Sequence, residues 1–174
     1  MEPDLYQQAQ SKFQHGDFEA ALLLCQNQQF KQLEADCLLE LKQAQLAVNI
    51  YEQLQLYSQA GFAAILAQDL TRAQSLYQRA VASPATKWGE FLIQFLNEAN
   101  NRQYSFPHDI ATPGYLTFRL YFEATYGYFL NYSLNDYLVR FLDYKDQLIK
   151  VYPEIIKDIG SAHLARKEHR QALV

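Results

Sequence analysis

Histidine is the side chain of this 174-residue chain best suited to metal binding and to acid–base catalysis near neutral pH. Two histidines on one helix bind a metal together when they are about four residues apart. His163 and His169 are six positions apart and therefore point to different faces of a helix. His15 and His108 lie on other segments. The spacing therefore predicts no metal site.

The two cysteines, Cys25 and Cys37, could supply a thiol nucleophile. Two cysteines are too few for a disulfide scaffold in a chain of this size, and we expect both thiols to be reduced. They fall on neighbouring predicted helices and could face each other. We favour packing in an apolar core over catalysis as their role.

The sequence contains none of the common catalytic or cofactor-binding motifs. It has no G-x-S-x-G, no glycine-rich phosphate loop, no HExxH and no CxxC. We therefore expect that this chain alone is not an enzyme, with no catalytic residue, no cofactor and no metal.

Aromatic side chains are concentrated between residues 115 and 144. Spacings such as Tyr137, Phe141 and Tyr144 follow the three-to-four-residue rule of a helix face, which favours burial in a core. A subset of the tyrosines could instead stack on a sugar or hold a peptide. Segment 104–110, within the only long predicted loop, would then be the lid over this ligand.

Small residues recur in pairs whose members are twelve positions apart, and the first three pairs follow one another at a constant step of twenty-six positions. Two antiparallel helices approach closely only where both present small side chains, so the pattern predicts a series of helical hairpins. The pairs are Ala9 with Ala21, Ala35 with Ala47, Gly61 with Ala73, and, near the end of the chain, Gly160 with Ala172.

These pairs, together with the Gly16-Asp17-Phe18 turn, make the sequence resemble the tetratricopeptide (TPR) repeat family, whose period is about 34 residues. The resemblance implies an all-α fold: a right-handed superhelix, or solenoid, of α-α hairpins. An irregular insertion is expected around residues 83–114. In this family the first helix of each hairpin lines a groove that holds an extended peptide or a partner helix.

The groove positions implied by the resemblance are Tyr6, Gln10 and Phe13 in the first hairpin, Gln32, Asp36 and Leu39 in the second, and Ser58, Phe62 and Ile65 in the third. Chaperone-binding members of the family clamp a terminal carboxylate with Lys, Arg and Asn, which these positions lack. An uncharged or apolar segment is therefore the expected ligand. The alternative is that these side chains only contact the following helices of the chain.

The hydrophobic periodicity predicts eleven helices, and Pro84 interrupts it after the sixth. One continuous domain is expected, with three short hairpins over 1–82, a helix and a long loop over 83–114, and aromatic-rich helices over 115–174. The last hairpin stops at Val174. We therefore expect the chain to be an N-terminal fragment of a longer protein. The predicted helices span 3–14, 17–27, 30–40, 43–54, 56–67, 70–82, 87–100, 114–131, 134–151, 153–166 and 168 to the end.

Composition narrows the function classes. Fifteen Lys and Arg against nineteen Asp and Glu give a net charge of −4, which does not suggest nucleic-acid binding. With no leader-like N-terminus and no long apolar stretch, we expect a soluble cytoplasmic protein that does not bind membranes.

Three functions fit this sequence. The first is a non-catalytic scaffold that binds a protein or peptide partner. The second is the N-terminal, substrate-recruiting domain of a larger enzyme, such as a glycosyltransferase of the SPINDLY and O-linked N-acetylglucosamine transferase kind. The third is a homo-oligomer that assembles through the final hairpin.

Overall fold

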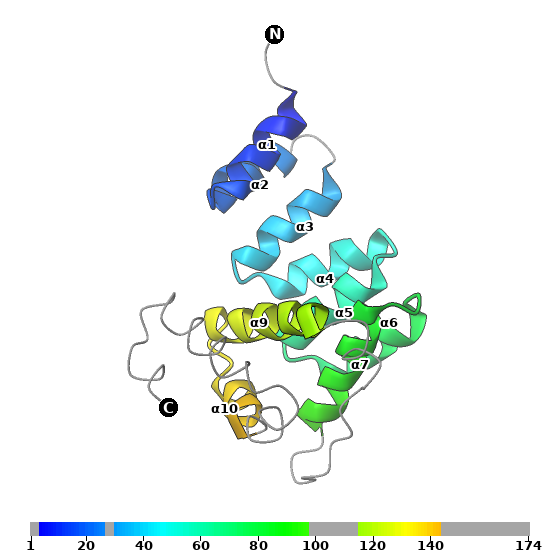
Figure 1. Ribbon diagram of the computed structural model, residues 1–174. Helices are drawn as coiled ribbons and strands as arrows, with labels where there is room; N and C mark the ends of the chain where they lie inside the picture. Colours follow the sequence, from blue (N-terminus) through cyan, green and yellow to red (C-terminus); the bar gives the residue numbers. More distant parts are fainter. Residues whose placement is uncertain (1–3, 27–29, 98–114, 144–174) are drawn as a thin grey trace, which may run out of the picture. The chain divides into compact units, whose positions relative to one another are not determined.

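The computed structural model describes residues 4–26, 30–97 and 115–143, and every regular element in these ranges is an α-helix (Figure 1). The all-α prediction is thus confirmed for this part of the chain. The chain divides into two compact units, Met1–Ile93 and Gln94–Val174. One continuous domain, with segments 1–82, 83–114 and 115–174, stays a prediction. Most of the helix that begins at Pro84 belongs to the first unit.

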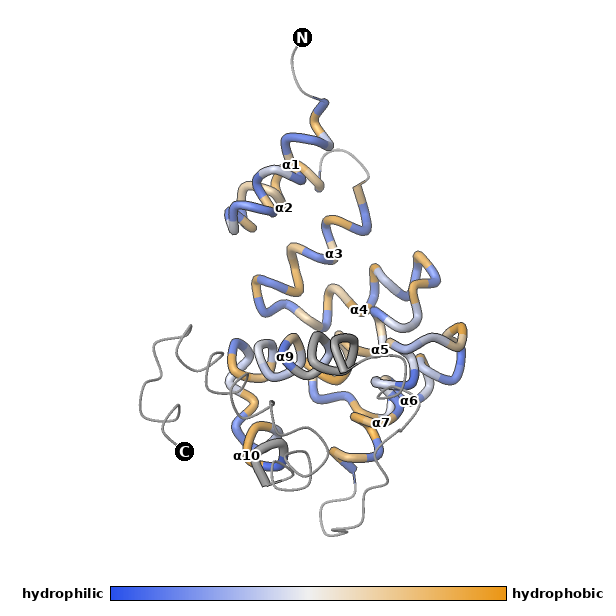
Figure 2. Tube along the Cα trace, viewed as in Figure 1, coloured by the Kyte–Doolittle hydropathy of each residue, from blue (hydrophilic) through white to orange (hydrophobic). Residues whose placement is uncertain are grey.

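Three consecutive helical hairpins begin the first unit, and each helix packs against the next one along the chain. The first and last residues of these six helices lie within three residues of the bounds predicted from the sequence. Hydrophilic and hydrophobic stretches alternate along α3 (Figure 2), and its buried residues lie on more than one side of the helix. The six helices are α1 (Leu5–Gln14), α2 (Phe18–Gln26), α3 (Lys31–Glu40), α4 (Ala44–Gln53), α5 (Tyr57–Leu66) and α6 (Leu70–Arg79).

Four of the turns between these helices share one backbone geometry. In each turn one residue has a positive φ, and these residues are Gly16, Lys42, Gln55 and Gln68. The amide of the following residue donates to a carbonyl five residues earlier, as Asp69 does to Ala64 at 2.9 Å. This is the Schellman motif, which satisfies the last carbonyls of a helix. Because the residue after the positive φ also begins the next helix, the helices reverse direction with very short connections.

The small residues of the first three predicted pairs lie in the interior of the first unit. Ala9 and Ala21, Ala35 and Ala47, and Gly61 and Ala73 are all buried. A Cβ atom added to Gly61 would lie 2.6 Å from the ring of Tyr77. The aromatic ring therefore occupies the space that the glycine leaves open.

A second set of equivalent positions lies between one hairpin and the next. The second helices carry Cys25, Tyr51 and Tyr77, which are all buried and follow the same step as the small-residue pairs. Twelve positions later, on the following first helices, stand the small residues Cys37, Ala63 and Gly89, all buried. A Cβ atom at Gly89 would lie only 1.9 Å from Tyr77 Cζ, so the Tyr77 ring packs directly over the backbone of its helix.

Helix α7 (Pro84–Asn97) continues this period. Thr86, Gly89 and Phe91 are buried like Ala60, Ala63 and Ile65 of α5 and like Glu34, Cys37 and Leu39 of α3. The burial of residues 86–91 thus matches that of the earlier first helices, and the start of the segment expected to be an irregular insertion is a regular helix. The remainder of that predicted insertion, 98–114, lies outside the described residues.

Pro84 starts a helix here instead of only ending one. The Ser83 hydroxyl accepts a hydrogen bond from the Thr86 amide at 3.1 Å, and the Ser83 carbonyl accepts one from the Lys87 amide at 3.0 Å. Ser83 is therefore the N-cap, and Pro84 occupies the first helical position, where it loses no hydrogen bond. The helix accordingly begins three residues earlier than predicted.

The second unit contains α9 (Tyr115–Asn131) and α10 (Asn135–Asp143), joined by the same type of turn. Ser133 has a φ of 55°, and the amide of Leu134 donates to the carbonyl of Phe129 at 2.9 Å. Gly127 and Val139 form a weak copy of the small-residue pair in the sequence, but this turn assigns the equivalent positions to Tyr126 and Leu138. Both are buried, whereas Val139 is 56% exposed.

The other pair predicted near the end of the chain, Gly160 with Ala172, lies outside the described residues. Within the described ranges, no helix combines the length and the apolar character needed to cross a membrane.

Candidate partner-binding face

The predicted groove positions differ strongly in exposure from one hairpin to the next. In the first hairpin Tyr6 is 41% exposed, Gln10 is exposed and Phe13 is half-buried. In the second, Gln32 is exposed, Asp36 is half-buried and Leu39 is buried. In the third, Ser58 and Phe62 are half-buried and Ile65 has no exposed surface. Access to solvent at these positions therefore decreases from α1 to α5.

Several of these side chains are engaged within the chain itself. The ring of Tyr6 meets that of Phe30 edge to face, with centroids 5.1 Å apart, and Phe13 meets Phe18 in the same way at 5.3 Å. Ile65 belongs to the core and could meet a partner only if the helices separated. The internal contacts that the sequence left as an alternative thus account for part of the predicted groove.

Asp36 joins the two helices of the second hairpin. Its Oδ1 accepts a hydrogen bond from the Tyr51 hydroxyl at 2.5 Å. Burial raises the pKa of the Asp36 carboxyl above its usual value of 3.8, and the hydrogen bond from Tyr51 partly opposes this rise. Asp36 therefore acts first as an internal acceptor for a tyrosine.

Ser58 is similarly engaged with the N-terminus of α7. Its hydroxyl lies 2.7 Å from Thr86 Oγ1, which also lies 3.0 Å from Ser83 Oγ. The Thr86 hydroxyl donates to the Val81 carbonyl at 2.7 Å. These bonds tie α5 to the α6–α7 connection, so Ser58 has a structural role.

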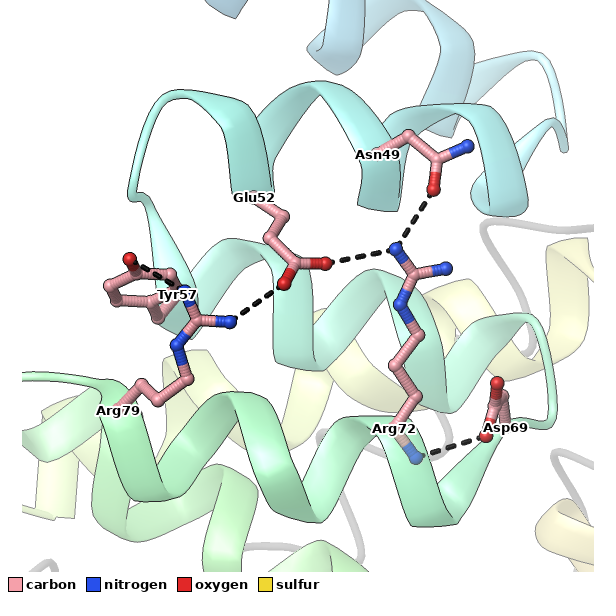
Figure 3. Close-up of polar contacts among 6 residues, drawn as sticks. All are labelled: Asn49, Glu52, Tyr57, Asp69, Arg72 and Arg79. Carbon is pink, nitrogen blue, oxygen red and sulfur yellow. Dashed lines mark hydrogen bonds and ion pairs between the residues drawn. The ribbon is translucent and has the colours of Figure 1, made fainter.

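A polar cluster on the second helices was not anticipated from the sequence (Figure 3). Glu52 of α4 accepts hydrogen bonds from Arg72 at 2.9 Å and from Arg79 at 2.7 Å, both of α6. Arg72 also donates to Asn49 at 2.8 Å, and Arg79 to the Tyr57 hydroxyl at 2.9 Å. Hydrogen bonds from Arg72 and then Arg79 lower the pKa of Glu52.

We refer to Glu52, Arg72 and Arg79 as the α4–α6 clamp. It shows that the second helices of consecutive hairpins lie within reach of each other. The two arginines are seven positions apart and thus share a helix face, which was the available sequence signal. Nothing in the sequence indicated that Glu52, on another helix, would lie between them.

The cysteines lie where the sequence placed them, on neighbouring helices and buried. Cys25 and Cys37 share one core cluster with Ala9, Ala21 and Leu33. Both thiols are free and buried, and they come from helices that pack against each other. Burial raises the pKa of both, that of Cys37 to about 12, so neither is an activated nucleophile in the folded chain.

Among the described residues, no three His, Cys, Asp or Glu side chains converge in a way that could hold a metal ion. His15 is exposed, and its Nδ1 lies 2.7 Å from the Ser11 carbonyl oxygen at the end of α1. The other three histidines and the predicted lid at 104–110 fall outside the described ranges.

Within the described part of the second unit, the aromatic segment contributes buried side chains. Tyr126 and Phe129 are buried, and Phe129 meets Tyr137 edge to face at 5.3 Å. Tyr121, Tyr128 and Tyr132 are half-buried. The preference for core packing is thus confirmed for Tyr126 and Phe129, while ligand contact by the half-buried tyrosines stays a prediction.

Comparisons with protein-family models, with curated proteins and with solved structures found no match for this chain. The resemblance to TPR proteins therefore stays a prediction based on the small-residue pairs. The first unit carries the features that bear on function: the exposed positions on α1 and α3, the α4–α6 clamp and the buried thiols.

Proposed function

We propose that this chain is a non-catalytic scaffold of TPR-like hairpins that binds a peptide or helix of a partner protein along α1 and α3. The observation that carries the proposal is the exposure of Tyr6, Gln10 and Gln32 on two successive first helices. Tyr6 and Gln32 occupy equivalent positions in the first two hairpins, and Gln10 lies one turn after Tyr6. We call these three residues the α1–α3 face.

The chemistry of the α1–α3 face indicates the kind of partner. A glutamine amide both donates and accepts hydrogen bonds, so Gln10 and Gln32 are suited to the peptide groups of an extended segment. Tyr6 offers an aromatic surface whose orientation is already restricted by Phe30. The face carries no formal charge, which favours an uncharged or apolar segment.

Two features support a superhelical arrangement of the first unit. The same Schellman turn recurs at four connections between α1 and α6, including the one that joins the second hairpin to the third. The α4–α6 clamp joins the second helices of successive hairpins. In a right-handed TPR-like superhelix the first helices would then line the concave side, with α1 and α3 accessible to a ligand.

A selection of random peptides displayed on phage, with the folded chain as target, tests the proposal while the partner is still unidentified. Enriched peptides are then titrated against the wild-type chain and against Gln10→Ala/Gln32→Ala. Because both glutamines are exposed, the double substitution should leave thermal stability nearly unchanged. We expect it to weaken binding by roughly tenfold or more, corresponding to two lost hydrogen bonds.

The matched control is Gln45→Ala/Gln74→Ala, which removes two exposed glutamines from α4 and α6 instead. This variant should bind as the wild type does. Equal loss of binding in both double variants would place the ligand elsewhere. A selection that enriches no peptide against a well-folded target would contradict the proposal itself.

A further inference from the structure

The contact between Cys25 and Cys37 departs from the packing at the equivalent positions. At the last of these contacts, the large ring of Tyr77 lies over Gly89. In the middle repeat the same two positions hold Tyr51 and Ala63, a large residue and a small one. Only between α2 and α3 are both residues cysteines, and there both lie in one buried core cluster on two helices that pack against each other.

The surroundings keep this pair away from solvent. Both cysteines have no exposed surface, and the partly buried side chains of Phe13, Leu22, Leu24 and Phe30 pack against their cluster. The cysteines come from consecutive helices that pack against each other. A bond between them would therefore link the first hairpin directly to the second.

We propose that Cys25 and Cys37 form a dithiol that small-molecule disulfides, such as oxidised glutathione, convert into a disulfide between α2 and α3. One thiolate attacks glutathione disulfide, which forms a mixed disulfide and releases one glutathione thiol. The second cysteine then attacks the protein sulfur of the mixed disulfide and releases the second glutathione. The protein loses two protons and two electrons, and one glutathione disulfide becomes two thiols.

Burial determines when this reaction occurs. Thiolate, and not thiol, is the attacking species, and the low dielectric around the pair suppresses thiolate formation. Oxidation therefore requires a local opening of the first hairpin, which packs on the rest of the unit through the contact of α2 with α3. Once formed, the disulfide would hold the first hairpin against α3.

The test is the thiol–disulfide equilibrium of the wild-type chain in glutathione redox buffers, measured by intact mass and by counting unreacted thiols, in native buffer and in concentrated urea. Because the folded chain already holds the sulfurs together, we expect the equilibrium constant for the disulfide to be roughly tenfold or more larger in native buffer than in urea. By linkage, the oxidised chain should also melt at a higher temperature than the reduced one.

The single variants Cys25→Ala and Cys37→Ala serve as controls, because each can form only a mixed disulfide with one glutathione. An equilibrium constant that is equal or smaller in native buffer would overturn the proposal. So would a wild-type chain that accumulates two glutathione adducts. Neither result depends on the variants being folded, since both are measured on the wild type.

Discussion

Tyr77 and Cys25 occupy equivalent positions two repeats apart, yet the two ends of the first unit are filled in different ways. At the C-terminal end, a tyrosine ring lies against Gly61 and Gly89, one on each neighbouring helix. At the N-terminal end, two cysteines share one buried core cluster. The backbone period is thus compatible with both a large side chain facing glycine and two side chains of intermediate size.

The largest effect is expected for Tyr77→Ala, which would empty the space between the two glycines. Tyr77 is only 3% exposed, and loss of a buried aromatic side chain typically costs about 3–5 kcal/mol of stability. Urea denaturation followed by circular dichroism measures this change. Tyr77→Phe, which keeps the ring, is the matched control and should cost far less. Equal losses in the two variants would show that the hydroxyl, and not the ring, is essential.

Gly89→Ala tests the same contact from the other side. Alanine is favoured over glycine in a helix by about 1 kcal/mol, yet its Cβ would lie 1.9 Å from the ring. We expect a net loss of about 1–3 kcal/mol, as is typical of overpacking. In the Tyr77→Ala background the same substitution should become neutral or stabilising. A loss that persists in that background would show that another neighbour limits the space at Gly89.

The turns offer a smaller contrast. Gly16 and Gln68 have positive φ values of 79° and 62° at equivalent places in the first and third hairpins. Because glycine adopts this conformation without strain, Gln68→Gly should stabilise the chain by up to about 1 kcal/mol, and Gly16→Ala should destabilise it by a similar amount. Thermal melts of both variants measure the difference. If Gln68→Gly instead lowered the melting temperature, the side-chain contacts of Gln68 would outweigh its backbone strain.

The smallest effect concerns Tyr51, which at the position equivalent to Tyr77 donates to Asp36. The Asp36 pKa is raised in the folded state, so its charge opposes folding at neutral pH, and this cost disappears as pH falls through the raised pKa towards 3.8. Asp36→Asn keeps an acceptor for Tyr51 and should be at least as stable as the wild type at pH 7.

In a denaturation series, the difference between Asp36→Asn and the wild type should shrink as pH falls through the raised pKa of Asp36 and be nearly gone below about pH 4, because the wild-type carboxyl is then largely neutral as well. Asp36→Ala is the comparison variant, since it leaves Tyr51 without this acceptor. If Asp36→Asn is the less stable protein at pH 7 and equal in acid, then the hydrogen bond to the charged carboxylate outweighs its desolvation.

The helices of the first unit could be predicted because small residues on both members of each hairpin recur at a constant step, and the hydrophobic period agrees with them. Membership of α7 in this repeat was missed because Lys87 stands where Ala35 and Gly61 stand in the earlier first helices. The second series, Cys37, Ala63 and Gly89, includes α7 at the same step. It marks contacts between one hairpin and the next, whereas the pairs used for the prediction lie within hairpins.

The candidate site was less predictable than the helices. Spacing placed Tyr6, Gln32 and Ser58 at equivalent positions, but it did not indicate which would meet another part of the chain. Ser58 is engaged because Thr86 comes close to it, 28 residues later. Amphipathic patterns show which side of a helix is covered and leave open what covers it. Exposure, and hence availability to a partner, followed only from the packed structure.

The positive-φ residues Lys42, Gln55 and Gln68 stand thirteen positions apart, so a single helix with its turn is the smallest interchangeable segment of this unit. Deleting one such segment would exchange first and second helices from that point onward and reverse the surfaces they present. Deleting or duplicating two consecutive segments, a whole hairpin, would preserve every later surface. Gene duplication in steps of one hairpin could therefore lengthen this array without disturbing its existing faces, and designers could use the same step.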